Sequence, residues 1–263
     1  MNKNDLVADL KKDLDIFCEI YASRPIQDNA GGMGFNHSFA LWKMLRVLNP
    51  DLVVESGIWK GHSTWLIETT LPNAKIISFD TNLAFRQYVS PAATYSEGDF
   101  QFYDWSSENL ENSLIFFDDH QNSFSRTLLA YFFGFKRLIF EDNYSPDNGD
   151  CYSLNHLLSG SGFPDIQLSS KHRKSFRSRV KRAWYLPVLR RVGSHQNWII
   201  PENRFDSKNL EHRTLKMVTF PRILQSDGTI EDQFLDSVPG FKSFKSEKNS
   251  EFSYNNITYL ELR

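Results

Sequence analysis

A short aliphatic run that leads through two spaced glycines into a helix-like segment limits the fold of this chain more than any other feature. Residues 51–63 read DLVVESGIWKGHS. The run Leu52–Val54 is typical of a buried parallel strand, and Thr64–Thr69 of the start of a helix packed on it. In the turn between them, glycines let a ligand approach the backbone, and the helix N-terminus presents free N–H groups. We therefore predict a strand, a turn and a helix belonging to an open α/β sheet.

Further apolar runs along the chain also end in acidic residues. The acids that end or closely follow the predicted strands are Glu55, Asp80, Asp99, Asp118, Asp119, Glu141 and Asp142. Strands that alternate with helices pair in parallel, and the C-terminal ends of such strands form the edge where α/β sheets bind ligands. A single carboxylate at a strand end is more often a helix cap or a loop residue. Five such ends in series predict a binding site.

The chain has 263 residues, enough for one large core or one core with an insertion. We expect one α/β domain in four parts: a helical cap over 1–48, a cofactor-binding core over 49–160, a basic insertion or lid over 161–215, and C-terminal strands over 216–263. Periodicity predicts helices over 4–22, 38–48, 123–132 and 153–158, and a last strand over 252–262.

Two local features between the first two predicted helices are open to interpretation. We expect Ser38 to be the N-cap of the second helix and Asn49-Pro50 to end it. The glycine-rich stretch Gly31–Asn36 is either a flap over a ligand or a turn between helices. The turn needs fewer assumptions.

The net charge is −2, so no overall field favours nucleic acid or an anionic membrane. Two cysteines, Cys18 and Cys151, form neither a disulfide framework nor a metal-ligand spacing. The sequence shows no signal-peptide pattern and no apolar run that could span a bilayer, and we expect a cytoplasmic protein.

The turn and the acids together resemble the class I S-adenosylmethionine (SAM)-dependent methyltransferases. The resemblance is strongest to metal-assisted O-methyltransferases of the catechol type and of the cephalosporin-hydroxylase and macrocin type. It covers Gly32–Asn143, and Phe252–Leu262 matches the last antiparallel strand of the family. It implies a Rossmann-like, doubly wound, mostly parallel sheet with an antiparallel C-terminal strand, an N-terminal helical cap and a late insertion.

The resemblance also assigns residues to the cofactor: Glu55, Gly57, Gly61, Ser63, Asp80, Asp99 and Phe100. The turn would hold the methionine part of SAM. Asp80 would accept hydrogen bonds from both ribose hydroxyls, as a carboxylate can. Asp99 would face the adenine amine, with Phe100 or Trp105 stacked on the ring. The turn lacks the third glycine of a dinucleotide fingerprint and has bulky Trp59 where a pyrophosphate approaches, which favours SAM over NAD.

The acids after the fourth and fifth predicted strands suit a hard divalent cation, Mg²⁺ first, because they offer only oxygen ligands. The sugar-type pattern of the family implies Asp118, Glu141 and Asp142 as ligands, and the catechol-type pattern Asp118, Asp142 and Asn143. Both registers stay open. In the family, the cation binds the acceptor hydroxyl, lowers its pKa and orients it toward the methyl group.

We expect Asp118 and His120 to be the catalytic residues, with His120 as the general base. The sugar-type enzymes carry D-x-x-H, whereas this chain has D-D-H, which leaves Gln121 at the usual base position. The sequence is equally compatible with a structural role, in which His120 only forms a hydrogen bond with the neighbouring loop. We interpret His37 and His62 as structural or solvated, since neither has an obvious carboxylate partner.

Residues Lys171–Arg191 contain nine Lys or Arg and no acid. A run of charges is most often a solvated face. Its alternative roles are contact with an anionic or nucleotide-linked substrate, with nucleic acid or with a membrane surface.

These features together predict a SAM-dependent methyltransferase that is assisted by a divalent cation and acts on the hydroxyl group of a small molecule or sugar. The alternatives are a nucleotide- or dinucleotide-binding oxidoreductase and a catalytically silent SAM-fold binding subunit. The expected partner is a hydroxylated small molecule, either a sugar or an anionic compound. We expect no membrane partner, nucleic acid is not favoured, and homo-oligomer formation stays open.

Overall fold

The computed structural model describes residues 1, 5, 8–145, 149–159, 210–220 and 256–263. The helices are α2 (Leu10–Ala22), α3 (Phe35–Leu48), α4 (His62–Thr70), α5 (Ser123–Phe133) and α6 (Leu154–Ser159). The strands are β1 (Leu52–Ser56), β2 (Lys75–Asp80), β3 (Ala93–Glu97), β4 (Ser113–Phe117), β5 (Arg137–Phe140), β6 (Thr214–Thr219) and β7 (Thr258–Leu262). Short 3₁₀ turns follow β2 and β3, at Leu83–Phe85, Phe100–Phe102 and Trp105–Ser107.

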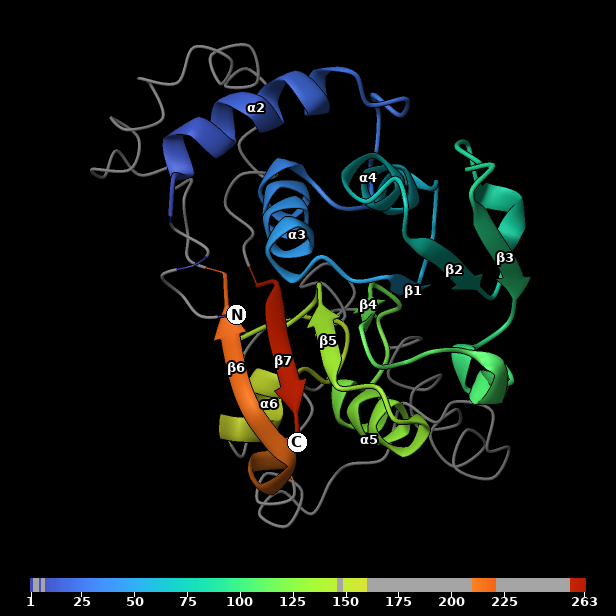
Figure 1. Cartoon of the computed structure of the whole chain (residues 1–263), viewed down its shortest axis with the longest axis vertical. Helices are drawn as coiled ribbons and strands as arrows, with labels where there is room; N and C mark the ends of the chain where they lie inside the picture. Colours follow the sequence, from blue (N-terminus) through green and yellow to red (C-terminus); the bar gives the residue numbers. More distant parts are fainter. Residues whose placement is uncertain (2–4, 6–7, 146–148, 160–209, 221–255) are drawn as a thin grey trace, which may run out of the picture.

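All seven strands form one sheet in the order β3-β2-β1-β4-β5-β7-β6 (Figure 1). Along the part of the sheet with the order β3-β2-β1-β4-β5, each strand pairs in parallel with its neighbour. Strand β7 is antiparallel to both β5 and β6. This order has one reversed strand near the C-terminus. It confirms the predicted Rossmann-like sheet with an antiparallel C-terminal strand.

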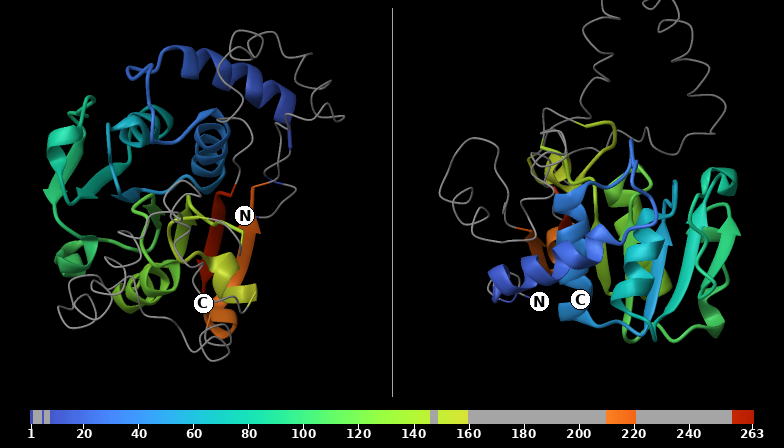
Figure 2. Two further views of the ribbon diagram at one scale, coloured as in Figure 1. Left: turned by 180° about the vertical axis from the view of Figure 1, so that it is seen from behind. Right: turned by 90° about the horizontal axis from the view of Figure 1, so that it is seen from above.

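Helices cover both faces of the sheet, so the core is split into two layers (Figures 1 and 2). Helices α2, α3 and α4 lie on one face, and α5 and α6 lie on the other. Because successive strand residues point to opposite faces, Val53 packs with the first group of helices and Val54 with the second. Aromatic side chains fill much of both layers, among them Phe17 and Phe39 in the first and Phe100 in the second.

The parallel register brings the C-terminal ends of five strands to the same edge. Val54 on β1 lies beside Ile77 on β2 and Ile115 on β4. Backbone bonds continue beyond the strands: Gly57 N donates to Phe79 O at 2.9 Å, and Asp118 N to Ser56 O at 2.8 Å. The acids that follow these strands therefore share one edge, as the sequence predicts.

The second helix begins earlier than expected, and the prediction of Ser38 as its N-cap is wrong. The helix starts at Phe35 with Gly34 as its N-cap. Ser38 lies one turn inside, where its hydroxyl donates to Gly34 O at 2.7 Å. The helix ends at Leu48 and is followed by Asn49 in the left-handed region, as predicted. The stretch from Gly31 is a turn that runs directly into this helix.

Several predicted features involve residues outside the described part. These are residues 160–209, which contain the basic run Lys171–Arg191, and the first part of the predicted last strand, residues 252–255. Both cysteines are buried and free. None of the helices within the described residues is long and apolar enough to cross a membrane.

Candidate functional site

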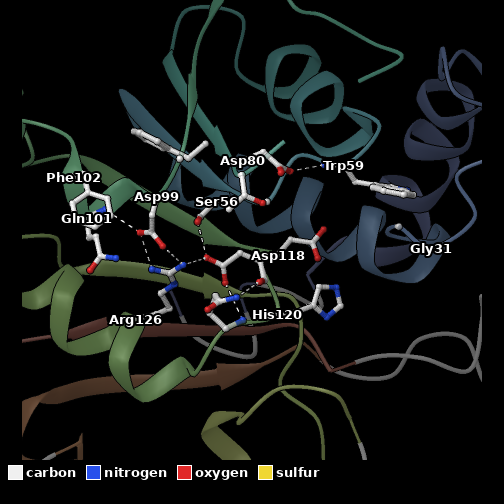
Figure 3. Close-up of a pocket in the computed structure, with 17 residues that line it drawn as sticks. Gly31, Ser56, Trp59, Asp80, Asp99, Gln101, Phe102, Asp118, His120 and Arg126 are labelled. Atoms are coloured by element: carbon white, nitrogen blue, oxygen red, sulfur yellow. Dashed lines mark hydrogen bonds and ion pairs between the residues drawn. The ribbon is translucent and has the colours of Figure 1, made fainter. Parts of the chain in front are cut away.

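A cavity of about 900 Å³ lies at the C-terminal edge of the parallel strands (Figure 3). The residues that line it are Gly31, Gly32, Ser56, Gly57, Trp59, Phe79, Asp80, Thr81, Gly98, Asp99, Gln101, Phe102, Asp118, Asp119, His120, Gln121 and Arg126. The lining combines the predicted turn and acids with the glycine-rich stretch before α3. The volume is within the range of ligand pockets, roughly 300–1,000 Å³.

The two glycines of the turn are required by close backbone contacts. Gly57 has φ +95°, and a Cβ there would lie 2.0 Å from the carbonyl oxygen of Asp118. Gly61 also has φ +95°, and its Cβ would lie 2.5 Å from Tyr88 O. Gly57 lines the cavity, whereas Gly61 is the N-cap of α4 and lies outside the lining. Any side chain at either position would push the turn away from its neighbours.

Glu55 lies beneath the turn, fully buried in β1. Its Oε2 accepts hydrogen bonds from Thr64 Oγ1 and Ser78 Oγ, each at 2.6 Å. Its Oε1 has no hydrogen-bond partner among the described residues. Burial raises the pKa of the Glu55 carboxyl, and hydrogen bonds from Ser63, Ser78 and Thr64 oppose that rise. Glu55 and Ser63 thus lie behind the cavity wall and not on it.

Asp80 ends β2 and lines the cavity. Its Oδ2 accepts the backbone N–H groups of Ile58 at 2.8 Å and Trp59 at 3.1 Å, and its Oδ1 accepts Asn82 N at 2.9 Å. The carboxylate therefore connects the end of β2 to the glycine turn. Trp59 has φ +50°, and its indole N–H donates to Ala30 O at 3.3 Å.

A charged network that the sequence analysis missed forms another part of the wall (Figure 3). Arg126 donates to both carboxylate oxygens of Asp99, at 2.9 and 2.7 Å, and pairs with Asp119 at 2.9 Å. Ser56 Oγ donates to the same Asp119 oxygen at 2.6 Å. The sequence feature that could have revealed this network was Arg126, a basic residue in the otherwise mostly apolar helix predicted over 123–132.

The aromatic residue predicted to stack on adenine does not line the cavity. Phe100 has no exposed surface and packs on Phe117 and Phe133. Trp105, the other candidate, is also buried. The exposed ring at this position is Phe102, which is 82% exposed and belongs to the lining. Within the 3₁₀ turn Phe100–Phe102 the first ring is buried and the last is exposed, and the sequence pattern could not show which of the two faces the cavity.

The acids after β4 and β5 form a cluster beside the cavity. Single ligand atoms of Asp118, His120 and Asp142 all lie within 4.8 Å of one another. The pKa of Asp118 lies well above its usual range because the carboxyl is buried and faces Glu141 and Asp142. Burial and Asp142 raise the pKa of Glu141 in the same way. Carboxylates that repel one another at this distance are a charge arrangement that a cation relieves.

Glu141 has a histidine partner, which corrects the interpretation of His37 as a histidine without a carboxylate. His37 Nδ1 contacts Glu141 Oε1, and both side chains are buried. Backbone N–H of Asn256 donates to His37 Nε2 at 3.0 Å, which leaves the proton of a neutral ring on Nδ1. The second histidine, His62, is buried and bonds Ser38 Oγ at 2.9 Å, so it is structural.

The Asn143 side chain is engaged in holding other elements together. Its Nδ2 donates to Thr258 Oγ1 on β7 at 2.8 Å, and its Oδ1 accepts Asn155 N on α6 at 2.8 Å. The residue is fully buried. This amide is therefore committed to the junction of β5, β7 and α6.

His120 follows β4 with φ +51° and reaches over the acid cluster. Its Nδ1 lies 3.0 Å from Asp150 Oδ1 and 3.2 Å from Asp142 Oδ2. The hydrogen bond to Asp150 and the charges of Asp142 and Asp118 raise the pKa of His120 to about 10, against the effect of its burial. These contacts favour the protonated form of the ring.

No protein-family model and no curated protein sequence matches the chain. Among solved structures, it is similar to the apo-structure of CmcI, with 24% identity over 40% of this chain and 52% of that chain and a TM-score of 0.32. It is also similar to CmcI with Mg and SAM, with 20% identity over 47% of this chain and 64% of that chain and a TM-score of 0.33. The chain thus spans about half to two thirds of these CmcI chains. It is also similar over 97% of its length to 91% of an O-methyltransferase from Bacillus cereus in complex with SAH, with 11% identity and a TM-score of 0.45.

Proposed function

We propose that this chain is a SAM-dependent O-methyltransferase that is assisted by a divalent cation, Mg²⁺ first, and acts on a hydroxylated small molecule or sugar. The observation that carries the proposal is one cavity whose wall combines the glycine turn, an acid at the end of β2, an acid after β3, and Asp118 with His120 after β4. Asp142, after β5, lies beside this wall, with a ligand atom within 4.8 Å of those of Asp118 and His120. The one Lys or Arg in this lining, Arg126, is paired with Asp99 and Asp119 and so is not available for a phosphate, which favours SAM over a dinucleotide.

The chain offers a matching group for each part of SAM. The turn at Gly57 would hold the methionine part, and buried Glu55 would support the turn from behind through its hydrogen bonds with Thr64 and Ser78. Asp80 would accept from the ribose hydroxyls, and Asp99 from the adenine amine. Phe102 takes the stacking role first assigned to Phe100, because its ring is exposed at the cavity.

Asp118, Glu141 and Asp142 would hold the divalent cation. Burial and, after it, the charges of the neighbouring acids raise the pKa values of Asp118 and Glu141, and a cation among these carboxylates would offset their repulsion. Thr258 and Asn155 engage both polar atoms of the Asn143 side chain, whereas His37 contacts one oxygen of Glu141, and this difference favours the register with Glu141 over the one with Asn143. A bound cation supplies Lewis-acid activation of an acceptor hydroxyl and fixes its oxygen.

His120 and Asp150 would handle the proton of the acceptor hydroxyl. A general base must be unprotonated, whereas the surrounding carboxylates hold a proton on His120. If Asp118 and Asp142 were to bind a cation, their negative charge would be neutralised, and the pKa of His120 would fall toward neutrality. Asp150 would then remain to orient the ring from 3.0 Å.

A second candidate function is a catalytically silent binding protein with the same fold. The D-D-H spacing favours it, because it leaves Gln121 at the usual position of the base. It predicts the same binding of SAM as the enzyme, but no methyl transfer.

Two measurements separate these functions. Titration calorimetry with SAM and with NAD identifies the cofactor, and we expect heat with SAM only; heat with NAD alone overturns the proposal. Methyl transfer to a panel of polyols and sugars, with Mg²⁺ or with EDTA, then distinguishes the enzyme from the binding protein. Activity that EDTA leaves unchanged rejects the role of the metal.

Asp118→Asn should abolish transfer while SAM still binds.

A further inference from the structure

The wall of the cavity contains a buried guanidinium that none of the proposed roles uses. Arg126 is on α5, is 6% exposed and lines the cavity beside Asp99 (Figure 3). Its Nη1 and Nη2 each donate to one oxygen of Asp99, at 2.9 and 2.7 Å. This paired geometry fixes the plane of the carboxylate as well as its position, which a single contact cannot do.

Other contacts hold the guanidinium itself in place. Asp119 accepts from Nη2 at 2.9 Å and is bonded in turn by Ser56 Oγ at 2.6 Å. The rings of Phe100 and Phe117 lie 5.1 and 5.9 Å from the guanidinium carbon. The arginine is therefore anchored to the ends of β1 and β4 and packed against aromatic rings. Because the guanidinium cannot move freely, its paired hydrogen bonds also fix the position of the Asp99 carboxylate.

These bonds leave Asp99 with little free hydrogen-bonding capacity. A carboxylate has about four acceptor positions. Oδ1 accepts from Arg126 Nη1 and from Gln101 N at 3.0 Å, and Oδ2 accepts from Arg126 Nη2. Within the described residues, one acceptor position on Oδ2 remains for a ligand. The Asp99 side chain is 22% exposed, and it lines the cavity.

We propose that Arg126 is a positioning residue that presents Asp99 to the cavity as a single, fixed hydrogen-bond acceptor and so selects a 6-aminopurine over a 6-oxopurine. The inference rests on the proposed function, in which Asp99 receives the adenine amine of SAM. An amine has an N–H to donate, whereas a 6-oxo group places a second acceptor against the carboxylate. Without the guanidinium, the bond from Gln101 N to Oδ1 remains but Oδ2 has no fixed partner among the described residues, so the plane of the carboxylate is no longer set and the selection is lost.

The test compares binding of S-adenosylhomocysteine with binding of S-inosylhomocysteine, which has an oxo group in place of the amine. Affinities are measured by titration calorimetry for the full chain, Arg126→Lys, Arg126→Met and the matched control Arg137→Lys. Arg137 starts β5 at the opposite end of the strand and bonds Asn112 at 2.7 Å. The ratio of the two affinities is the informative quantity, because a general loss of structure lowers both affinities together.

We expect the unaltered chain and Arg137→Lys to prefer the adenosyl compound by at least about tenfold. In both Arg126 variants the preference should fall below about threefold, since lysine keeps the charge but cannot make the paired contact. A preference that persists in Arg126→Lys and Arg126→Met overturns the inference. Equal binding of the two compounds by the unaltered chain also overturns it, and leaves the proposed function standing.

Binding of neither compound by the unaltered chain removes the proposed function, and this inference with it. If the Arg126 variants fail to fold, as judged by circular dichroism, Asp119→Asn supplies the test. This variant keeps Arg126 and weakens one of its anchors, so the preference should fall by about threefold or more. An unchanged preference in Asp119→Asn then counts against the positioning role.

Discussion

At the scale of single residues, two glycines near the cavity differ in what surrounds them. Both have a positive φ, +95° at Gly57 and +133° at Gly98. A Cβ at Gly57 would overlap the backbone of Asp118, whereas a Cβ at Gly98 would have no described atom within 4 Å outside its own chain neighbours. Gly57 is therefore required by both conformation and space, and Gly98 by conformation alone.

Alanine at these two positions should give clearly different stabilities. We expect Gly57→Ala to lower the free energy of unfolding by at least about 3 kcal/mol, because backbone strain adds to a backbone overlap. Gly98→Ala should cost about 1–2 kcal/mol from strain only. Urea unfolding of both variants measures the difference. Equal costs would show that the turn can move away from Asp118 freely.

A second residue-scale effect concerns His62, which is buried and neutral in the folded protein. Burial, together with the nearby charge of Arg24, lowers its pKa from 6.5 to about 4. In the unfolded chain the ring takes up a proton below about pH 6.5, whereas the folded protein does not until about pH 4. The contribution of His62 to stability is thus complete above the unfolded pKa and is lost as the pH falls through this window.

The folded protein should therefore become less stable between pH 6.5 and pH 4, with up to roughly 3 kcal/mol of the change arising from His62. His62→Gln keeps a donor toward Ser38 but cannot titrate. Its unfolding free energy, measured in urea at several pH values, should fall less steeply than that of the unaltered chain. Parallel curves for the two proteins would contradict the assignment.

At the scale of elements, α2 is joined to α3 by a small group of charges. Lys43 on α3 contacts Asp13 on α2 and donates to Ala8 O at 2.9 Å. The Lys43 and Asp13 side chains are each only 8% exposed. Arg46 pairs with the same aspartate at 2.9 Å but is 44% exposed. The buried pair and the exposed pair should therefore differ in strength.

Removing Asp13, which both basic residues share, should destabilise the packing of α2 on α3 more than removing the exposed Arg46. Asp13→Ala leaves the Lys43 ammonium buried without its partner and should cost about 3 kcal/mol. Arg46→Ala should cost less than about 1 kcal/mol, because solvent screens this pair. Thermal unfolding of the two variants tests the ranking, and an equal effect would mean that Lys43 reaches solvent once its partner is gone.

Most elements of the core could be predicted from apolar runs and helical spacing, with bounds that differ from the structure by one or two residues in β1 and α5. The first helix, predicted from residue 4, is α2 from Leu10, and the second helix begins three residues before its predicted start. Its predicted start at Ser38 relied on a side-chain cap, whereas the helix begins at Phe35 after Gly34, which caps it without a side-chain hydrogen bond. Local capping preferences could not reveal this start, because buried Phe35 and Asn36 extend the helix through tertiary packing.

At the scale of the whole molecule, the edge that carries the site was predictable, but the contacts within it were not. Acids after parallel strands must gather at one edge, so Asp80 and Asp118 could be placed from the sequence alone. The bond between Arg126 and Asp99 joins residues 27 apart, and that between His37 and Glu141 joins residues 104 apart. Such pairs depend on how helices pack on the sheet, and no local pattern encodes them.

The most direct test of the account is a crystal structure of the protein soaked with SAM and Mn²⁺, with anomalous data to locate the metal. We predict SAM in the cavity with its ribose at Asp80 and its adenine at Asp99, and a metal peak among Asp118, Glu141 and Asp142. SAM bound elsewhere, or an empty cavity at saturating SAM, would contradict the central claim that the acidic strand ends form one methyl-donor site.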